Sequence, residues 1–378
     1  MRVEVIKLPF KVKRSVLAVG SQAKNTVCFV RGSSAYISQV HQDLSVPQDL
    51  VDFEKDARYF LKKKPQRIAF DYHPEYSSSS FVLHLSSFVG RTLPVYHHHA
   101  HICACMAENG MKNQKVIGVA FDGTGLGLDN AIWGAEFLAC DYLGFKRLAH
   151  LREIPLAGAG QAIFQPWRLA AFWLYRSFGD NFKGLGVSWL DKLDANKWRI
   201  IKDAAEIGIN SPLTSSVGRL FDAAASLILG KMYAEYEAQL PIELERLALR
   251  RARDEGRGTI LAYSFVIRKE REKYVIDPAG LFKGIISDLK KEIPKEVIAY
   301  KFHVSMAIMV KKVCVMLKKS TGINKIVLAG GVFQNKLLLE LSQKLLKSSS
   351  FQVIVHKKLP ANDASLSLGQ AVIAAMRK

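Results

Sequence analysis

The C-terminal end of the sequence alternates between two kinds of apolar run, and no other feature restricts the fold as strongly. Helical periodicity over residues 298–319, 335–346 and 364–377 encloses two short β-rich runs, at 325–331 and 351–356. Strands that alternate with helices along a chain form parallel sheets whose faces the helices cover. The sequence therefore predicts an α/β fold.

The N-terminal part opens differently, with short β-rich runs separated by turn residues after a basic leader. These runs predict an antiparallel meander followed by a buried strand that ends in a carboxylate, and they span residues 15–20, 26–31, 34–39 and 66–71. Residues 160–250 read as mainly helical, and the charged stretch 249–274 as a solvated loop or hairpin. At 378 residues the chain exceeds what one core usually fills, so we expect two lobes with a cleft between them.

Charge and cysteine content narrow the class of protein. The chain has 54 basic and 34 acidic residues, a net charge of +20, which favours an anionic partner such as a nucleotide, an acidic protein or a nucleic acid. The basic residues are scattered, so a solubilising surface explains the charge equally well. Neither a signal peptide nor a membrane-length apolar run is present, which predicts a cytoplasmic protein without a membrane partner. The five cysteines form no C-x-x-C pair and are expected to be free thiols: Cys28, Cys103, Cys105, Cys140 and Cys314.

Four histidines lie within residues 97–101, immediately before an apolar helical run. Residues four apart share one face of a helix, so His97 and His101 can point at the same spot. Two imidazoles on one helical turn form half of a metal site, which carboxylates from elsewhere would complete. The alternative is a helix N-terminus that carries surface histidines or histidines with hydrogen-bond partners.

Two glycine-containing strings lie where nucleotide-binding loops are usually found. Asp122-Gly123-Thr124-Gly125 follows a buried strand, where backbone amides can approach a phosphate while the aspartate faces a cation. Asp222 lies one helical turn after Gly218, so the two can face one ligand. A strand-terminal Asp-Gly turn is also common without a ligand.

Two strings near the C-terminus each open a helix. Gly330 and Gly331 follow a strand and precede Asn335, which allows a nucleotide to approach a helix N-terminus. The string matches neither a phosphate-binding P-loop nor a dinucleotide fingerprint, and a tight structural turn is the alternative. Asp363 stands where an N-cap is expected, and capping alone would explain it.

Together these strings resemble one family. YHHHAHICACMAENG, VIGVAFDGTGLG, LREIPLAGAG, SSVGRLFDA, LAGGVFQN and LPANDASLSLGQA occur in the order of the carboxy-terminal domain of the HypF hydrogenase maturation factors, over roughly residues 14–376. The resemblance implies an ASKHA-type α/β fold (the actin, sugar kinase and Hsp70 architecture). The first lobe would be residues 1–114 with the C-terminal helix 364–378, and the second residues 115–363 with a helical insertion.

The resemblance also implies an activity and a site. The family transfers a carbamoyl group from carbamoyl-adenylate to the C-terminal cysteine thiolate of HypE, which leads to the cyanide ligands of nickel–iron hydrogenase. It implies a divalent metal (iron, zinc, manganese or magnesium) held by His97, His101, Asp122 and Asp363. ATP or carbamoyl-adenylate would lie beside the metal, against Gly123, Thr124, Gly125, Gly218, Asp222, Gly330, Gly331 and Asn335.

The chain departs from the family pattern in three ways. It has no zinc-finger cysteines and no room for the YrdC-like domain that makes carbamoyl-adenylate, which leaves a separate YrdC-like protein as a candidate partner. Ala238 stands where the family leads us to expect glycine, and AGAG at 157–160 lacks the expected acidic residue.

Two alternative functions compete with this interpretation. A tRNA threonylcarbamoyl transferase similar to TsaD would use the positive charge, but DGTG, QPWR and SSVGRLFDA resemble HypF instead and argue against tRNA. A non-catalytic nucleotide-binding partner would not need to keep both histidines and both aspartates of the predicted metal site.

Overall fold

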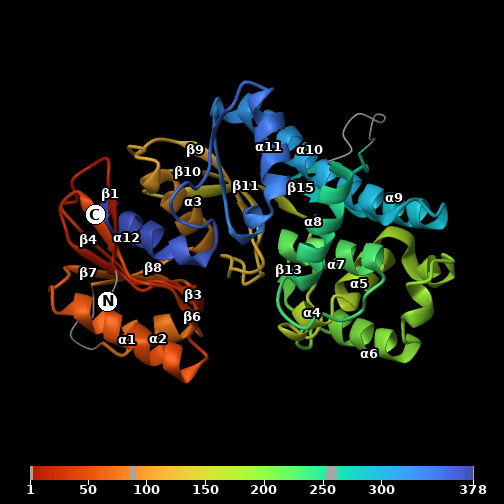
Figure 1. The fold of residues 1–378 in the computed structure, drawn as a ribbon, viewed down its shortest axis with the longest axis horizontal. Helices are drawn as coiled ribbons and strands as arrows, with labels where there is room; N and C mark the ends of the chain where they lie inside the picture. The colour runs from red at the N-terminus through yellow and green to blue at the C-terminus, as the bar shows by residue number, and fades with distance from the viewer. Residues whose placement is uncertain (1–2, 86–90, 253–261, 378) are drawn as a thin grey trace.

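The computed structural model describes residues 3–85, 91–252 and 262–377, and it contains two mixed β-sheets (Figure 1). The first sheet has the strand order β1 (Glu4–Lys7), β5 (Ser34–Ile37), β4 (Cys28–Arg31), β2 (Val16–Ala18), β7 (Arg67–Asp71) and β8 (Thr92–Val95). The predicted meander is confirmed, because β2, β4 and β5 pair in antiparallel fashion. The basic leader does more than predicted: it contains β1, which pairs with β5 at the edge of the sheet.

The second sheet contains seven strands. Their order is β14 (Val266–Glu270), β15 (Lys273–Asp277), β11 (Phe145–Leu151), β10 (Ala135–Cys140), β9 (Val116–Phe121), β16 (Lys325–Ala329) and β17 (Gln352–Ile354). As the C-terminal alternation predicts, β9, β16 and β17 run parallel. The expected hairpin is present as β14 and β15, while residues 253–261 of the predicted charged stretch lie outside the described residues.

Two helices form a layer between the sheets, α3 (His97–Glu108) and α12 (Leu366–Met376) (Figure 1). One continuous apolar cluster contains residues of both helices together with Val16 and Ala18 of the first sheet and Ala120 of the second. The helices approach closely: a Cβ atom on Gly369 would lie 1.9 Å from the carbonyl oxygen of Ala100. The shared layer therefore fixes the start of α3 relative to both sheets.

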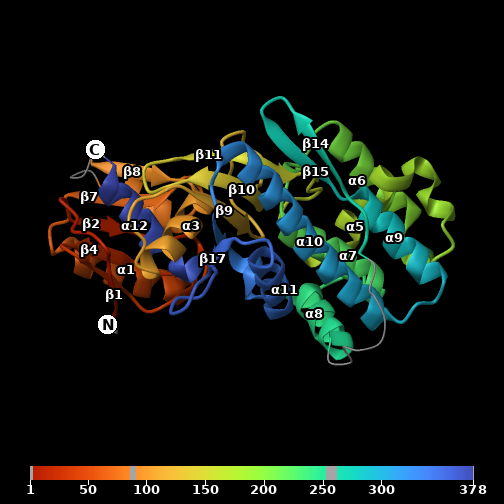
Figure 2. The same cartoon turned by 90° about the horizontal axis from the view of Figure 1, so that it is seen from above.

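Each sheet is covered by further helices on its other face. The first carries α1 (Pro47–Leu61) and α2 (Ser77–Leu83), which cover the side from which Leu17 and Phe70 project. The second carries α10 (Lys295–Thr321) and α11 (Lys336–Lys347), and α10 runs along the molecule toward the helical region (Figure 2). The predicted helix 77–89 ends at Leu83, and residues 86–90 lie outside the described residues.

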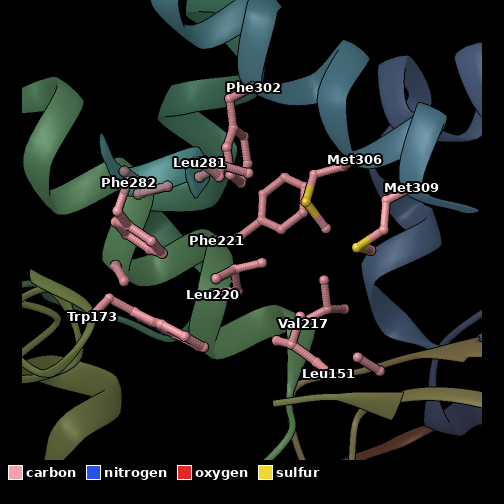
Figure 3. Packing of buried hydrophobic residues seen from close by; sticks show 14 of the residues in the cluster. Leu151, Trp173, Val217, Leu220, Phe221, Leu281, Phe282, Phe302, Met306 and Met309 are labelled. Atoms are coloured by element: carbon pink, nitrogen blue, oxygen red, sulfur yellow. The ribbon is translucent and has the colours of Figure 1, made fainter. Parts of the chain in front are cut away.

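The helical region lies at the end of the molecule away from the first sheet (Figure 1). It contains α4 (Gln161–Phe164), α5 (Trp167–Phe178), α6 (Ala195–Glu206), α7 (Val217–Leu229), α8 (Gln239–Ala252) and α9 (Ala279–Lys290). Aromatic side chains fill its core, where Trp173 stacks on Phe282 and Phe221 meets Phe302 edge-on (Figure 3). The first turn of α7 meets the end of β9, where the backbone N–H of Gly218 donates to the carbonyl oxygen of Asp122 at 3.1 Å. In the described part of the chain, no helix has the length and apolarity to cross a bilayer.

Candidate metal centre and adjoining cavity

Helix α3 brings two imidazoles to one point. The Nε2 atoms of His97 and His101 lie 3.2 Å apart, as their four-residue spacing predicts. Asp122 follows β9 directly, and its Oδ2 lies 2.9 Å from Nε2 of His101 and 3.5 Å from Nε2 of His97. Asp363 is the first residue of a short 3-10 turn (Asp363–Ser365), and its Oδ1 lies 3.4 and 3.6 Å from the two imidazoles. One ligand atom from each residue lies within 4.8 Å of all the others.

A fifth residue, Asp71, orients this cluster and was not predicted to belong to it. It ends β7, is fully buried, and its Oδ2 accepts a 2.8 Å hydrogen bond from Nδ1 of His97. A proton held on Nδ1 leaves Nε2 as the atom through which a neutral His97 would bind a metal ion in the cluster. Asp71 is the carboxylate with which the predicted buried strand 66–71 ends, and that strand end was the signal for it.

The donor set fits a metal ion. Within the described residues, Oδ2 of Asp122 and Nδ1 of His101 are buried and make no hydrogen bond of acceptable geometry. Such unpaired buried atoms are rare in native proteins, and here one of them points into the four-residue cluster. Two imidazole nitrogens with two carboxylate oxygens suit zinc, iron or manganese, and this set does not choose among them.

The side chains of the cluster strongly shift one another's pKa values. Burial lowers the pKa of His97, but Asp363 and Asp71 outweigh burial and raise that pKa well above its usual value. Burial raises the pKa of Asp122, yet His101 and His97 lower it further, and the net pKa lies well below the usual range. Asp363 behaves in the same way. Both carboxylates are therefore ionised at neutral pH, which is the form that binds cations.

Capping, the alternative explanation of Asp363, is wrong. The residue before it caps the turn: Oδ1 of Asn362 accepts a 3.1 Å hydrogen bond from the backbone N–H of Ala364. The carboxylate of Asp363 does not cap the turn, and it faces the two imidazoles.

The other two histidines of the run have structural contacts. Burial lowers the pKa of His98 to about 3 and that of His99 to about 4, so both are neutral. His99 donates from Nε2 to the carbonyl oxygen of Asp141 at 2.7 Å. A Cβ atom on Gly125 would lie 2.4 Å from Cε1 of His98, so this glycine makes room for the ring.

A cavity of about 590 Å³ opens beside the cluster and shares Asp122 with it. Its wall contains Lys24 from the N-terminal part of the chain, residues that follow β9 and β16, and residues of α7, of α8 and of the segment before α8: Lys24, Asp122, Gly123, Gly218, Arg219, Phe221, Tyr236, Glu237, Ala238, Pro241, Ile242, Glu245, Gly331, Val332, Gln334 and Asn335. Four residues predicted to contact a nucleotide are in this wall, namely Gly123, Gly218, Gly331 and Asn335.

The remaining predicted contacts, Thr124, Gly125, Gly330 and Asp222, are not in this wall. Gly330 has φ +99°, and a Cβ atom there would lie 2.3 Å from the carbonyl oxygen of Phe121, so the turn itself requires glycine. Asp222 lies behind the wall, with Oδ2 2.9 Å from Nε of Arg219, and its contact with a ribose stays a prediction. Asn335 caps α11 through Leu338 and donates a 3.0 Å hydrogen bond from Nδ2 to His303.

Two family models match nearly the whole chain. One, described as the HypF Kae1-like domain, covers residues 11–108, and the other, described as the second subdomain of the Kae1-like carbamoyltransferase domain, covers residues 118–370. The chain belongs to the HypF family. Its predicted α/β fold is confirmed by solved HypF structures: a full-length, phosphate- and nucleotide-bound HypF matches with a TM-score of 0.89 and 37% identity over 98% of this chain. HypF from T. kodakarensis matches with a TM-score of 0.85 and 27% identity.

The chain covers only part of the length of several curated relatives. HypF of Synechocystis is 34% identical over 97% of this chain but extends further, so that the match covers 48% of it. The solved full-length HypF is likewise covered over 57% of its length. The chain thus spans about half the length of several curated HypF proteins that it matches. A shorter HypF homolog from Cupriavidus necator is 32% identical and is covered over 91% of its length.

Ala238, where the HypF pattern leads us to expect glycine, has an unusual backbone conformation. This alanine, in the cavity wall, has φ +64°, a left-handed conformation that glycine adopts without strain. The expectation of glycine at this position matches the backbone that the fold builds there.

Proposed function

We propose that this chain is a carbamoyltransferase that holds carbamoyl-adenylate in the cavity and transfers its carbamoyl group to the C-terminal cysteine thiolate of HypE. One observation carries the proposal: the His97, His101, Asp122 and Asp363 cluster lies at the wall of a cavity large enough for a nucleotide. Membership of the HypF family supports this function over tRNA modification, for which the scattered positive charge is the main support.

Each part of the site has a role in this reaction. His97, His101, Asp122 and Asp363 would hold a divalent metal, which supplies Lewis-acid polarisation of the carbamoyl or phosphate oxygen. The glycine loops around Gly123 and Gly331 bring backbone close to the phosphate, where a larger side chain would intrude.

The acceptor thiol must come from outside the chain. All five cysteines are free and buried, and burial raises the pKa of each thiol. A buried thiol of high pKa is a poor nucleophile, so none of them serves as a covalent carrier. A flexible C-terminal tail can bring its cysteine into a narrow cavity, as HypE would. Free buried thiols also suit the reducing cytoplasm in which we place the protein.

The test is carbamoyl transfer to HypE, followed by mass spectrometry of HypE. With preformed carbamoyl-adenylate, or with a YrdC-like protein that makes it, we expect HypE to gain one carbamoyl group. With carbamoyl phosphate and ATP alone we expect little product, because adenylate synthesis belongs to the YrdC-like protein.

Two variants test whether a loss of activity comes from the site itself or from a weakened fold. Asp363→Ala should abolish the product because it removes one of the four clustered groups. The matched control is Asp56→Asn, which also alters a carboxylate paired with a buried histidine, His41, but away from the cluster. Full product from Asp363→Ala would contradict the assignment of the site, and full product from carbamoyl phosphate and ATP alone would contradict the division of labour.

A further inference from the structure

One wall residue of the cavity, Arg219, has hydrogen-bonding capacity that the described chain does not use. It lies in the first turn of α7 and is 2% exposed. Its Nε and Nη1 are buried and make no hydrogen bond within the described residues. A buried guanidinium with unused donors is unfavourable, because it has lost water without gaining partners.

A second buried arginine, Arg147, shows that this fold can satisfy such a group. Its guanidinium donates twice to Glu136, at 2.6 and 3.0 Å, and also to Asp129 and Ser215. The vacant donors are therefore a property of position 219 and not of buried arginines in general.

The surroundings of Arg219 direct its free end toward the cavity. Asp222, one turn further along α7, lies at the Nε side, 2.9 Å away but without the alignment of a hydrogen bond. The opposite end, Nη2, lies beside Gly123, within 3.4 Å of where a Cβ atom on that glycine would be. The carboxylate of Glu237 also approaches Nη2, to 3.9 Å, which is longer than a hydrogen bond. An anion bound beside Gly123 would thus meet the guanidinium.

A second cation reaches the same cavity from the other lobe. Lys24 belongs to β3 (Ala23–Asn25), which pairs with β6 (His41–Asp43), and it lines the cavity with φ +47°. The ligand is thus faced by a buried arginine from one lobe and a lysine from the other. The clustered carboxylate Asp122 is in the same wall.

We propose that Arg219 is a catalytic residue that binds the phosphate of the adenylate, with Lys24 as a second positive charge and Asp222 as the positioning residue behind Arg219. This inference rests on the proposed function and deepens it. A planar fork of N–H donors matches phosphate oxygens, whereas a ribose or a base offers no such charge.

The charge change during transfer gives Arg219 its catalytic effect. The thiolate sulfur attacks the carbamoyl carbon and forms a C–S bond, while the bond between that carbon and the phosphate oxygen breaks. The electron pair of the broken bond stays on the phosphate, which leaves as AMP with one more negative charge than it had in the mixed anhydride. A fixed guanidinium therefore interacts more strongly with the departing phosphate than with the bound substrate.

The test compares AMP with adenosine, two probes that differ only in the phosphate, by calorimetry on the full chain. We expect the wild-type chain to bind AMP more tightly than adenosine. Arg219→Gln should weaken AMP binding by about 10- to 100-fold and leave adenosine binding unchanged, as is typical for one charged hydrogen-bonding group. The matched control, Arg58→Gln, removes the same charge from an exposed site on α1 and should bind both probes as the wild type does.

The outcomes separate the inference from the proposed function. If Arg219→Gln keeps the preference for AMP, or loses both probes equally, the phosphate role is overturned while the nucleotide cavity stands. If the wild-type chain binds neither probe, the proposed nucleotide site fails and the inference fails with it. Should Arg219→Gln not fold because Asp222 is left unpaired, Arg219→Lys keeps a positive charge beside Asp222 but removes the planar fork of donors, and it should still weaken AMP binding more than adenosine binding.

Discussion

Adjacent residues of this site divide structural and chemical roles between them. Gly330 shapes a turn, while Gly331 forms the wall of the cavity. Asn362 caps a helical turn, while the carboxylate of Asp363 joins the cluster. The division arises because each residue of a turn points in its own direction, so one position faces the backbone and the next faces the cavity.

The two glycines allow a direct test of this division. At Gly330 the positive φ and the 2.3 Å approach to Phe121 leave no room for a methyl group, so Gly330→Ala should lower the free energy of unfolding by about 1–3 kcal/mol. At Gly331 the three atoms nearest to a Cβ atom would be Oδ1 of Asp122 at 3.1 Å, Nε2 of Gln334 at 3.8 Å and Cβ of Asn362 at 4.0 Å, so no backbone atom is among them. Gly331→Val should therefore leave stability nearly unchanged and weaken binding of ATP. Urea unfolding and calorimetry measure the two effects, and tight ATP binding by Gly331→Val would refute the role of this loop.

At this scale the sequence reveals spacing but not long-range contact. The four-residue spacing of His97 and His101 predicts their convergence because a helix fixes it. The hydrogen bond between His97 and Asp71 joins residues that are 26 positions apart in the sequence. The place of Arg219 in the cavity wall depends on how α7 packs. Neither follows from a local sequence pattern.

Strand ends and helix starts provide the scaffold of the metal cluster. Asp71 ends β7, Asp122 follows β9, and α3 begins at His97, so the first sheet, the second sheet and the shared helical layer all contribute to the site. The C-terminal alternation predicts β16, α11 and α12, whose periodicity is unambiguous. It does not predict β1, because a short charged strand at a sheet edge is defined by its pairing partner and not by its own composition.

The hydrogen bond from His97 to Asp71, the last residue of β7, predicts that Asp71 affects metal affinity. Asp71→Asn keeps the size of the side chain but removes the charge that holds the proton on Nδ1 of His97, so metal affinity should fall by about 10- to 100-fold. Competition with a chelator, followed by elemental analysis, measures this. Asp56→Asn is again the control, since Asp56 lies on α1, against the first sheet, and faces the buried His41 at 3.3 Å. Equal losses in the two variants would show a general weakening of this part of the fold and not a role in orienting His97.

Across the whole molecule, buried histidines link stability to pH. Burial lowers the pKa of His98 to about 3, and those of His99 and His303 to about 4, from 6.5. Below pH 6.5 these three histidines take up protons in the unfolded chain but stay neutral in the folded protein. The free energy of unfolding therefore falls as the pH falls. Asp222 acts in the opposite direction below about pH 6, because its raised pKa makes the folded state bind a proton first. His73 and His150, whose pKa values burial also lowers, act with these three rings. The raised pKa values of His97 and His101 act with Asp222 near pH 6.5, because both imidazoles bind a proton first in the folded state. The lowered pKa values prevail further down, and the net effect is acid destabilisation between about pH 5.5 and 4.5.

One variant isolates a single proton of this linkage. His303 is fully buried in α10, where Nδ1 donates to the carbonyl oxygen of Ala299 and Nε2 accepts from Asn335. In His303→Gln the amide oxygen can still accept from Asn335, but the group no longer titrates. The fall in the free energy of unfolding between pH 6 and pH 5 should therefore be smaller by up to about 1.4 kcal/mol per pH unit than in the wild type. His84→Gln makes the same exchange at an exposed position directly after α2 and serves as the control for the substitution itself. Urea unfolding in metal-free buffer measures the slopes, and an unchanged slope in His303→Gln would mean that the fold lets this ring take up its proton.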